Sequence, residues 1–169
     1  MTSIQDPFEL QTVADCIKND LNLEYQLIER SILLPLDSLV IVLEPDSDGQ
    51  ARATNIMFIP LDDADYRAIK LLQFYTELPL ILDEQGLTNI EPLLRTINLY
   101  TPIGTFSLND QKQIIFKYVY ILGKFNTINS AEFVEMFSLW LRNLDTLSRL
   151  IKEVARAEKT VEQALNTLS

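Results

Sequence analysis

The chain has 169 residues, of which 47% are hydrophobic and 22% are charged, and these proportions are typical of a single folded domain. Twenty-four acidic residues against fourteen basic ones give a formal net charge of −10, which repels a phosphate backbone and disfavours nucleic acid as a partner. The absence of histidine excludes Ser-His-Asp and Cys-His nucleophile pairs and histidine-containing metal sites, and the single cysteine excludes an intramolecular disulfide and thiolate metal clusters.

Targeting and cofactor motifs are also missing from the sequence. Residues 1–7 lack the basic and apolar regions of a signal peptide, and no apolar run approaches the roughly 18 residues of a membrane span. The four glycines stand far apart, and none begins a phosphate-binding loop. We therefore expect a cytoplasmic protein with no membrane span, no metal and no cofactor.

The first predicted element is a helix that begins near Asp6. Asp6, Pro7 and Glu9 stand in the order of a capping residue, a first-turn proline and a third-position glutamate. An apolar stripe at helical spacing follows, formed by Leu10, Val13, Ala14, Ile17 and Leu21. Cys16 lies within this pattern, and we predict that it is a buried, inert thiol.

The next segments have the patterns of strands. Residues 23–30 alternate with a period of two, which predicts a half-buried strand. Residues 39–43 are all apolar, and with residues 51–59 and the turn between them they predict an antiparallel hairpin. Residues 70–82 suit either a strand or a helix, and their aromatic content and Pro79 favour a strand.

The second half begins with a predicted helix. A capping box at residues 88–91 opens it, and Thr101 and Pro102 end it. Residues 104–108 and 113–122 then alternate across a polar turn, which predicts a second hairpin. A last helix begins after this hairpin, and the order of elements predicts an α+β domain in which helices pack on an antiparallel sheet.

The last helix carries a heptad seam, in which apolar positions recur at alternating steps of four and three. The positions of the seam are Phe133, Phe137, Trp140, Leu144, Leu147, Ile151, Val154, Glu158, Val161, Leu165 and Leu168. A continuous helix of this length spans roughly 55 Å, more than the approximately 40 Å diameter of a compact domain of this size. Residues 156–169 would therefore protrude or dock as an extension. Two interpretations carry equal weight: the seam binds a partner or a second copy, or it packs within its own domain with a kink near residues 156–159.

Two clusters of aspartates are the only groupings with metal-binding or catalytic chemistry. Asp46 and Asp48 precede Gly49 as in a calcium loop, but Ala51 occupies the position where such a loop needs glycine. We predict a hairpin turn there. The second cluster follows Pro60 and is predicted to be a loop or a helix start, with a weak Mg²⁺ site as the alternative. Its members are Asp62, Asp63 and Asp65.

A family resemblance covers about residues 93–150. Its motifs are Leu-Leu-Arg-Thr-Ile-Asn at 93–98, Pro-Ile-Gly-Thr-Phe-Ser-Leu-Asn-Asp at 102–110, a strand, and Ser-Ala-Glu at 130–132 opening a helix. In these motifs the chain resembles the YbjN-like, type III secretion chaperone-like group. The resemblance implies a curved antiparallel sheet with flanking helices and a long C-terminal helix, frequent dimerisation and no enzymatic activity. It also implies a regulatory role or the holding of partly unfolded segments on apolar patches. The loop at 62–65 and the extension past Ala155 lie outside the pattern.

We therefore expect a non-enzymatic protein-binding module, chaperone-like or regulatory, that acts as a homodimer and holds a partner on an apolar surface of the sheet or of the last helix. The residues expected at this surface on the helix are Trp140, Leu144, Leu147, Ile151, Val154, Val161, Leu165 and Leu168. The alternative is an assembly factor or subunit of a larger complex. A third hypothesis is a carboxylate- or Mg²⁺-dependent enzyme, which depends on the two aspartate clusters.

Overall fold

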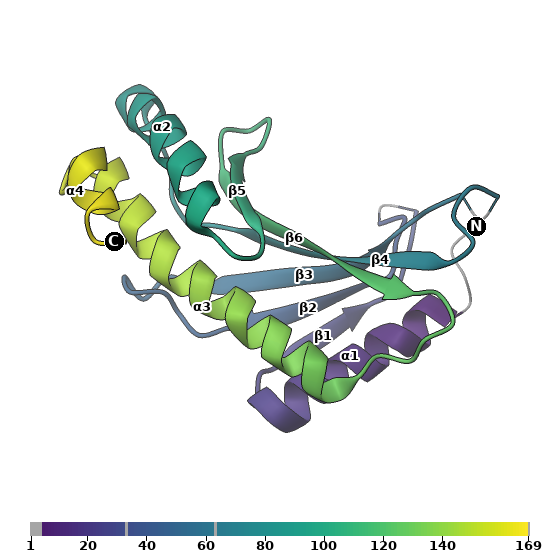
Figure 1. Cartoon of the computed structure of the whole chain (residues 1–169). Coiled ribbons are helices and arrows are strands. Elements are labelled where there is room, and N and C mark those ends of the chain that lie inside the picture. The colour runs from purple at the N-terminus through teal and green to yellow at the C-terminus, as the bar shows by residue number, and fades with distance from the viewer. Residues whose placement is uncertain (1–4, 33, 63, 169) are drawn as a thin grey trace.

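The computed structural model describes residues 5–32, 34–62 and 64–168, and it confirms the predicted α+β class (Figure 1). The elements are α1 Gln5–Leu21, β1 Tyr25–Ile28, β2 Ser38–Leu43, β3 Arg52–Ile59, β4 Ile69–Glu77, α2 Glu84–Tyr100, β5 Thr105–Leu108, β6 Ile114–Gly123, α3 Ser130–Ala155 and α4 Val161–Leu165. The six strands form one open antiparallel sheet in the order β1-β2-β3-β4-β6-β5. Both predicted hairpins are present, and the ambiguous segment 70–82 contributes the strand β4.

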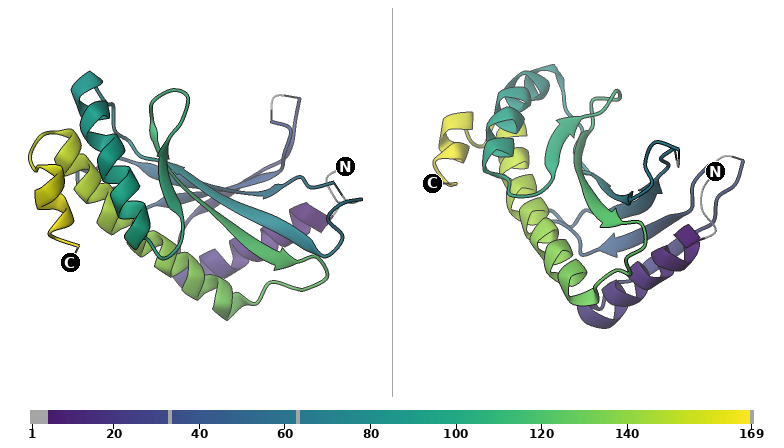
Figure 2. Two further views of the ribbon diagram at one scale, coloured as in Figure 1. Left: turned by 45° about the horizontal axis from the view of Figure 1, so that its top comes forward. Right: turned by 45° about the vertical axis from the view of Figure 1, so that its right-hand side comes forward.

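The sheet is covered by helices on one face. Figures 1 and 2 show α1 and α3 along the same side of the curved sheet, with α2 beside the end of α3 and close to β5. Side chains alternate across each strand, and on β4 Leu72 and Phe74 are fully buried under the helices whereas Leu71 and Gln73 on the other side are only partly buried. The two faces of the sheet therefore have different environments.

The centre of the core is a group of aromatic rings contributed by α3 and the sheet. The ring of Phe74 lies 5.9 to 6.1 Å from the rings of Phe133, Phe137 and Trp140 on α3. Phe116 of β6 stacks on Trp140 at 5.2 Å. These contacts show why the first part of the heptad seam is apolar, because it faces the sheet.

The first helix begins close to the predicted position, since α1 includes Gln5, but Asp6 then lies inside the helix and is not its capping residue. The predicted start of the second helix is wrong. The helix α2 begins one turn before the predicted capping box, because Asp83 caps it by accepting a hydrogen bond from the backbone N–H of Gly86. Gly86 is buried, and a Cβ at this position would lie 3.6 Å from the backbone carbonyl of Ala155, so the start of α2 lies close to the end of α3.

The last helix ends at Ala155 and does not continue to the C-terminus. Ala157 adopts the left-handed conformation with φ of +56°, which turns the chain away from the axis of α3. A second helix, α4, then starts at a capping box formed by Thr160 and Gln163. The structure thus has the kink of the second interpretation, and α4 docks against α2 and α3.

Cys16 is buried on α1, as predicted. Among the residues that the structure describes, no helix combines the length and the apolar character needed to cross a lipid bilayer.

Candidate partner-binding surface

The face of the sheet opposite the helices carries a contiguous group of apolar side chains, which we call the open-face patch. Ile59, Leu71 and Ile121 lie side by side on β3, β4 and β6. In the next row, Met57 on β3 and Val119 on β6 lie on either side of the polar Gln73 of β4. Because successive residues of a strand point to opposite faces, all five side chains point away from the helices.

The open-face patch is accessible to solvent. Ile121 is 63% exposed, and the other four members are partly exposed. Val42 of β2 is exposed on the same face. Within the described part of the chain, no helix packs on this face (Figure 2). Covering such a patch removes apolar surface from water, which makes it a candidate interaction surface.

Polar residues border the open-face patch towards the other end of the strands. Tyr75 lies opposite Lys117 on β6, and its hydroxyl donates a hydrogen bond to Glu77 at 3.0 Å. Burial raises the pKa of Tyr75, an effect that the hydrogen bond with Asn109 opposes and the adjacent Glu77 reinforces. At this border the uncharged hydroxyl of Tyr75 therefore lies near the cation Lys117 and the anion Glu77.

A shallow hollow of about 300 Å³ continues the open-face patch on the side of β5. Its lining residues are Gly104, Thr105, Ser107, Lys117, Tyr118 and Val119. Gly104 has a φ of +81°, and a Cβ there would lie 2.6 Å from the ring of Phe116, so no other residue fits without a shift. Since Val119 belongs to both the hollow and the patch, the two form one surface.

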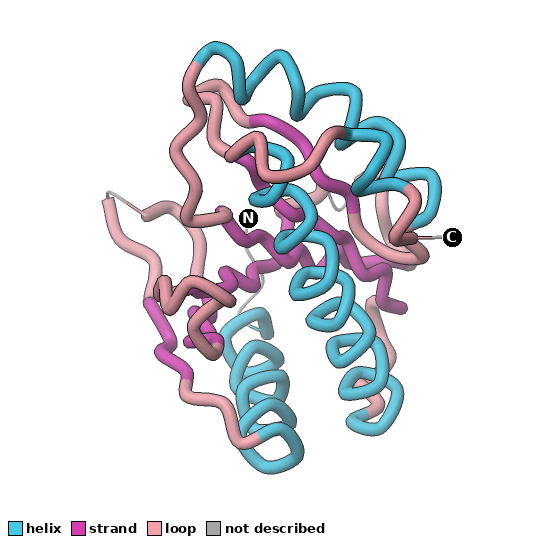
Figure 3. The backbone as a smooth tube through the Cα atoms, turned by 90° about the vertical axis from the view of Figure 1, so that its left-hand side faces the viewer, coloured by secondary structure: helices cyan, strands magenta, loops and turns pink. Residues whose placement is uncertain are grey.

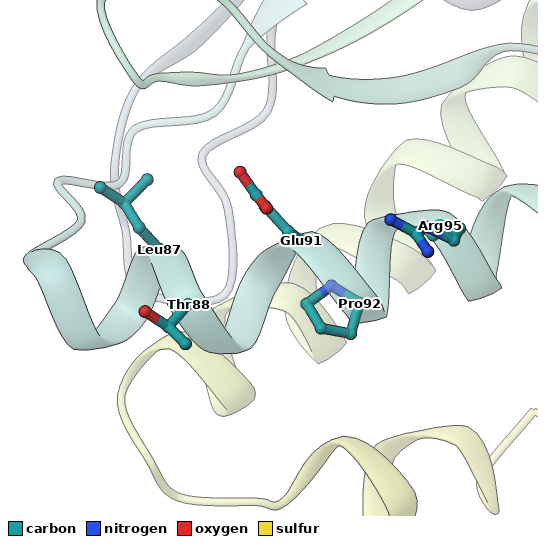
Figure 4. A pocket seen from close by; sticks show the side chains of 5 residues that line it. All are labelled: Leu87, Thr88, Glu91, Pro92 and Arg95. Atoms are coloured by element: carbon teal, nitrogen blue, oxygen red, sulfur yellow. The ribbon is translucent and has the colours of Figure 1, made fainter.

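A second hollow of about 300 Å³ lies along α2. Figure 4 shows its five lining side chains, which all come from this one helix: Leu87, Thr88, Glu91, Pro92 and Arg95. They are spread along the helix and do not converge from different elements on one point. This hollow has the geometry of a helix surface.

The first aspartate cluster forms the predicted turn between β2 and β3. Asp46 accepts hydrogen bonds from the backbone N–H groups of Asp48 and Gln50 at 2.9 and 3.0 Å. Both aspartates also bind Lys152 of α3, and Asp48 binds Arg156 at 2.7 Å. We call Asp46, Asp48, Lys152 and Arg156 the turn cluster. It fastens the β2–β3 turn to the end of α3.

The turn cluster contains a buried ion pair. The side chains of Lys152 and Asp46 are 3% and 4% exposed. Burial raises the pKa of Asp46, but hydrogen bonds from Lys152 and from two backbone N–H groups outweigh burial and lower the pKa overall. Hydrogen bonds from Arg156 and Lys152 lower the pKa of Asp48 to about 2. Both carboxylates are therefore ionised at neutral pH and engaged in structural ion pairs.

The turn cluster makes stability dependent on acid. A carboxyl whose pKa is lowered by folding stabilises the folded state above its unfolded pKa of about 4, and this stabilisation is lost as the pH falls through the folded pKa. We expect the melting temperature to fall between about pH 4 and pH 2. The variant Asp48→Asn is expected to melt at a lower temperature than wild type at pH 7 and to lose less between pH 4 and pH 2, as measured by calorimetry. Parallel profiles for the two proteins would contradict this role of Asp48.

The second aspartate cluster lies in the loop between β3 and β4. Asp62 accepts a hydrogen bond from the backbone N–H of Ala64 at 2.9 Å, so this segment is a turn. Asp65 is exposed in the same loop, and Asp63 lies outside the described residues. In the ranges 5–32, 34–62 and 64–168, no three side chains of histidine, cysteine, aspartate or glutamate gather as metal ligands would.

The structure places the predicted partner-binding residues of the last helix inside the domain. Five residues of α3 are buried: Trp140, Leu144, Leu147, Ile151 and Val154. The other three, Val161, Leu165 and Leu168, are partly buried against the same core. The expectation that these side chains form an open surface for a partner is therefore corrected. They pack within the domain, where they contribute to its hydrophobic core.

The open-face patch was not singled out as a site by sequence reasoning. Its members are apolar residues of strands, and alternation alone does not show which face of a sheet the helices cover. The signal that was available is the second apolar set on β3, β4 and β6, because a strand with one solvated face normally carries polar residues there.

Comparison with known proteins adds no assignment to these observations. No protein-family model and no curated protein matches the chain. The function is therefore inferred from the open-face patch and its surroundings.

Proposed function

We propose that this protein is a non-enzymatic protein-binding module, chaperone-like or regulatory, which holds an apolar segment of a partner on the open-face patch. The observation that carries the proposal is the one-sided sheet: five apolar side chains from three strands lie together on a face that the helices do not cover. The resemblance to the YbjN-like, secretion chaperone-like group supports it. We further propose that the protein acts as a homodimer in the cytoplasm, since a chain with a single cysteine forms no intramolecular disulfide that would need an oxidising compartment.

The dimensions and charge of this surface favour an amphipathic helix as the bound segment. Three strands spaced about 4.8 Å apart make the patch about 10 Å wide, which matches the width of one α-helix. The protein carries a net charge of −10, so basic residues flanking the apolar stripe of the partner would speed its association. The hollow beside Lys117 would accept an acidic or polar side chain at the border of the patch.

A peptide-display experiment tests the proposal. Peptides with a helical apolar stripe are selected on the wild-type protein, and their dissociation constants are measured by calorimetry. The variant Ile121→Lys is expected to weaken binding more than about tenfold, because a charge within the apolar contact loses part of its hydration. It is expected to leave the free energy of unfolding within about 0.5 kcal/mol, because the side chain is largely exposed.

The matched control is Ile81→Lys, since Ile81 is 99% exposed in the loop between β4 and α2, outside the open-face patch. This control should bind the selected peptides as wild type does. Equal binding by both lysine variants, or selected peptides that protect amides elsewhere from hydrogen exchange, would refute the open-face patch as the binding surface.

A further inference from the structure

The two edges of the sheet differ in how their backbone groups are satisfied. At the β5 edge, the side chain of Asn98 on α2 donates a hydrogen bond to the carbonyl of Phe106 at 2.8 Å and accepts one from its N–H at 2.9 Å. One amide side chain thus takes both outward backbone groups of Phe106, and α2 contacts β5. At Phe106 this edge is therefore not available for pairing with another strand.

The β1 edge has no such cover. The N–H of Val42 donates to the carbonyl of Glu24, which makes this opposed pair a hydrogen-bonded pair of the antiparallel ladder. Because hydrogen-bonded and non-hydrogen-bonded pairs alternate, the N–H and C=O groups of Tyr25 and Leu27 point away from β2. In the part of the chain that the structure describes, no hydrogen bond reaches these four groups. Figure 3 shows β1 at the margin of the molecule, with no other segment outside it.

We propose that a second copy of this chain binds at this edge, with β1 of each copy paired antiparallel about a two-fold axis at Gln26. In this register Tyr25 opposes Leu27 of the second copy, and the converse pair is equivalent. All four outward backbone groups of each strand then form hydrogen bonds, and two sheets become one sheet of twelve strands. The inference gives the interface of the homodimer proposed above and does not depend on what the open-face patch binds.

The side chains of β1 are self-complementary in this register. The strand Tyr-Gln-Leu-Ile carries no charge, although the chain as a whole has a net charge of −10. The flanking acids also avoid each other, since Glu24 falls opposite Ile28 and Glu29 falls opposite Leu23. Two acidic proteins can therefore meet here without opposed like charges. The half-covered Leu27, 36% exposed, is buried by the tyrosine of the second copy.

A cysteine pair measures the register directly. Gln26 is exposed and would lie opposite itself in a non-hydrogen-bonded pair, with Cα atoms about 4.5 Å apart, a distance that a disulfide spans. The variant Gln26→Cys is expected to form a covalent dimer in mild oxidant. The native Cys16 is buried and contributes little background. The control Asn55→Cys lies on the same face but two strands inside the sheet, and it should stay monomeric on a non-reducing gel.

A second experiment places opposite charges at position 26 of the two copies. Gln26→Lys and Gln26→Glu should each weaken the dimer about fivefold in sedimentation experiments, and a mixture of the two should form a heterodimer. A strict monomer at millimolar concentration, or crosslinking no faster at Gln26→Cys than at Asn55→Cys, would overturn the proposal. A strict monomer would also refute the homodimer proposed above, whereas a dimer that does not crosslink at Gln26→Cys would refute only this interface. Both results leave peptide binding to the open-face patch intact, so they are distinguishable from failure of the binding function.

Discussion

Replacing Trp140 with alanine is expected to lower the free energy of unfolding by about 3–5 kcal/mol, whereas a partner-binding tryptophan would tolerate the change. Trp140 is fully buried, and its ring contacts Phe74, Phe116 and Phe137 at centroid distances of 5.2 to 5.9 Å. Its removal leaves a cavity between α3 and the sheet that these rings cannot fill without leaving their own contacts. The cost therefore combines lost burial with lost packing.

Urea unfolding followed by circular dichroism measures the effect, because Trp140 is the only tryptophan and its variant has no indole fluorescence. The control is Leu139→Ala on the outer face of the same helix, where 38% of the residue is exposed and the expected loss is much smaller. Equal losses for the two variants would mean that α3 does not pack on the sheet as the structure shows.

The prediction for Trp140 also explains how much of the fold the sequence determines. Periodicity identified the strands and the apolar seam correctly, because alternation and heptad spacing are local properties. Whether a seam faces its own sheet or another molecule depends on which face of the sheet lacks a cover, and that is a property of the whole fold. The kink at Ala157 makes α3 shorter than the continuous helix of the first interpretation. The capping box at Thr160 and Gln163 is the local signal that could have predicted a new helix start there.

The predicted start of α2 was wrong for a related reason. A capping box at residues 88–91 is a valid local pattern, but Asp83 caps the helix five residues earlier, and Thr88 instead donates its hydroxyl to the carbonyl of Glu84 within the helix. The additional turn begins beside the end of α3, and α2 packs on α3, so this tertiary contact favours the earlier cap.

Ion pairs between segments that are distant in the sequence could not be predicted from local patterns. Asp46 and Asp48 were predicted to form a turn, and they do, but Lys152 lies 106 residues after Asp46. Nothing in the local pattern around Lys152 distinguishes it from a solvated lysine on a helix. Its burial follows from the position of the β2–β3 turn over the last turn of α3.

Replacing Lys152 with methionine is expected to lower the free energy of unfolding by about 3–5 kcal/mol, the second large effect. Methionine keeps most of the volume of the lysine stem but removes the charge, and this leaves the carboxylate of Asp46, 4% exposed, without its counter-ion. Asp48 is affected less, because Arg156 still donates to it at 2.7 Å. The cost is therefore mainly the burial of one unpaired carboxylate.

A matched control and a second substitution separate this cost from the loss of helix contacts. Arg149→Met lies one turn earlier on α3, where the arginine side chain is 67% exposed and pairs with Glu153, so its expected cost is only about 0.3–0.5 kcal/mol. Adding Asp46→Asn to Lys152→Met should recover part of the stability, because asparagine is neutral yet still accepts the backbone hydrogen bonds of the turn. A double-mutant cycle by urea unfolding measures the coupling between the two sites. Additive losses would mean that the buried pair contributes no interaction energy, and the β2–β3 turn would then be held on α3 by packing alone.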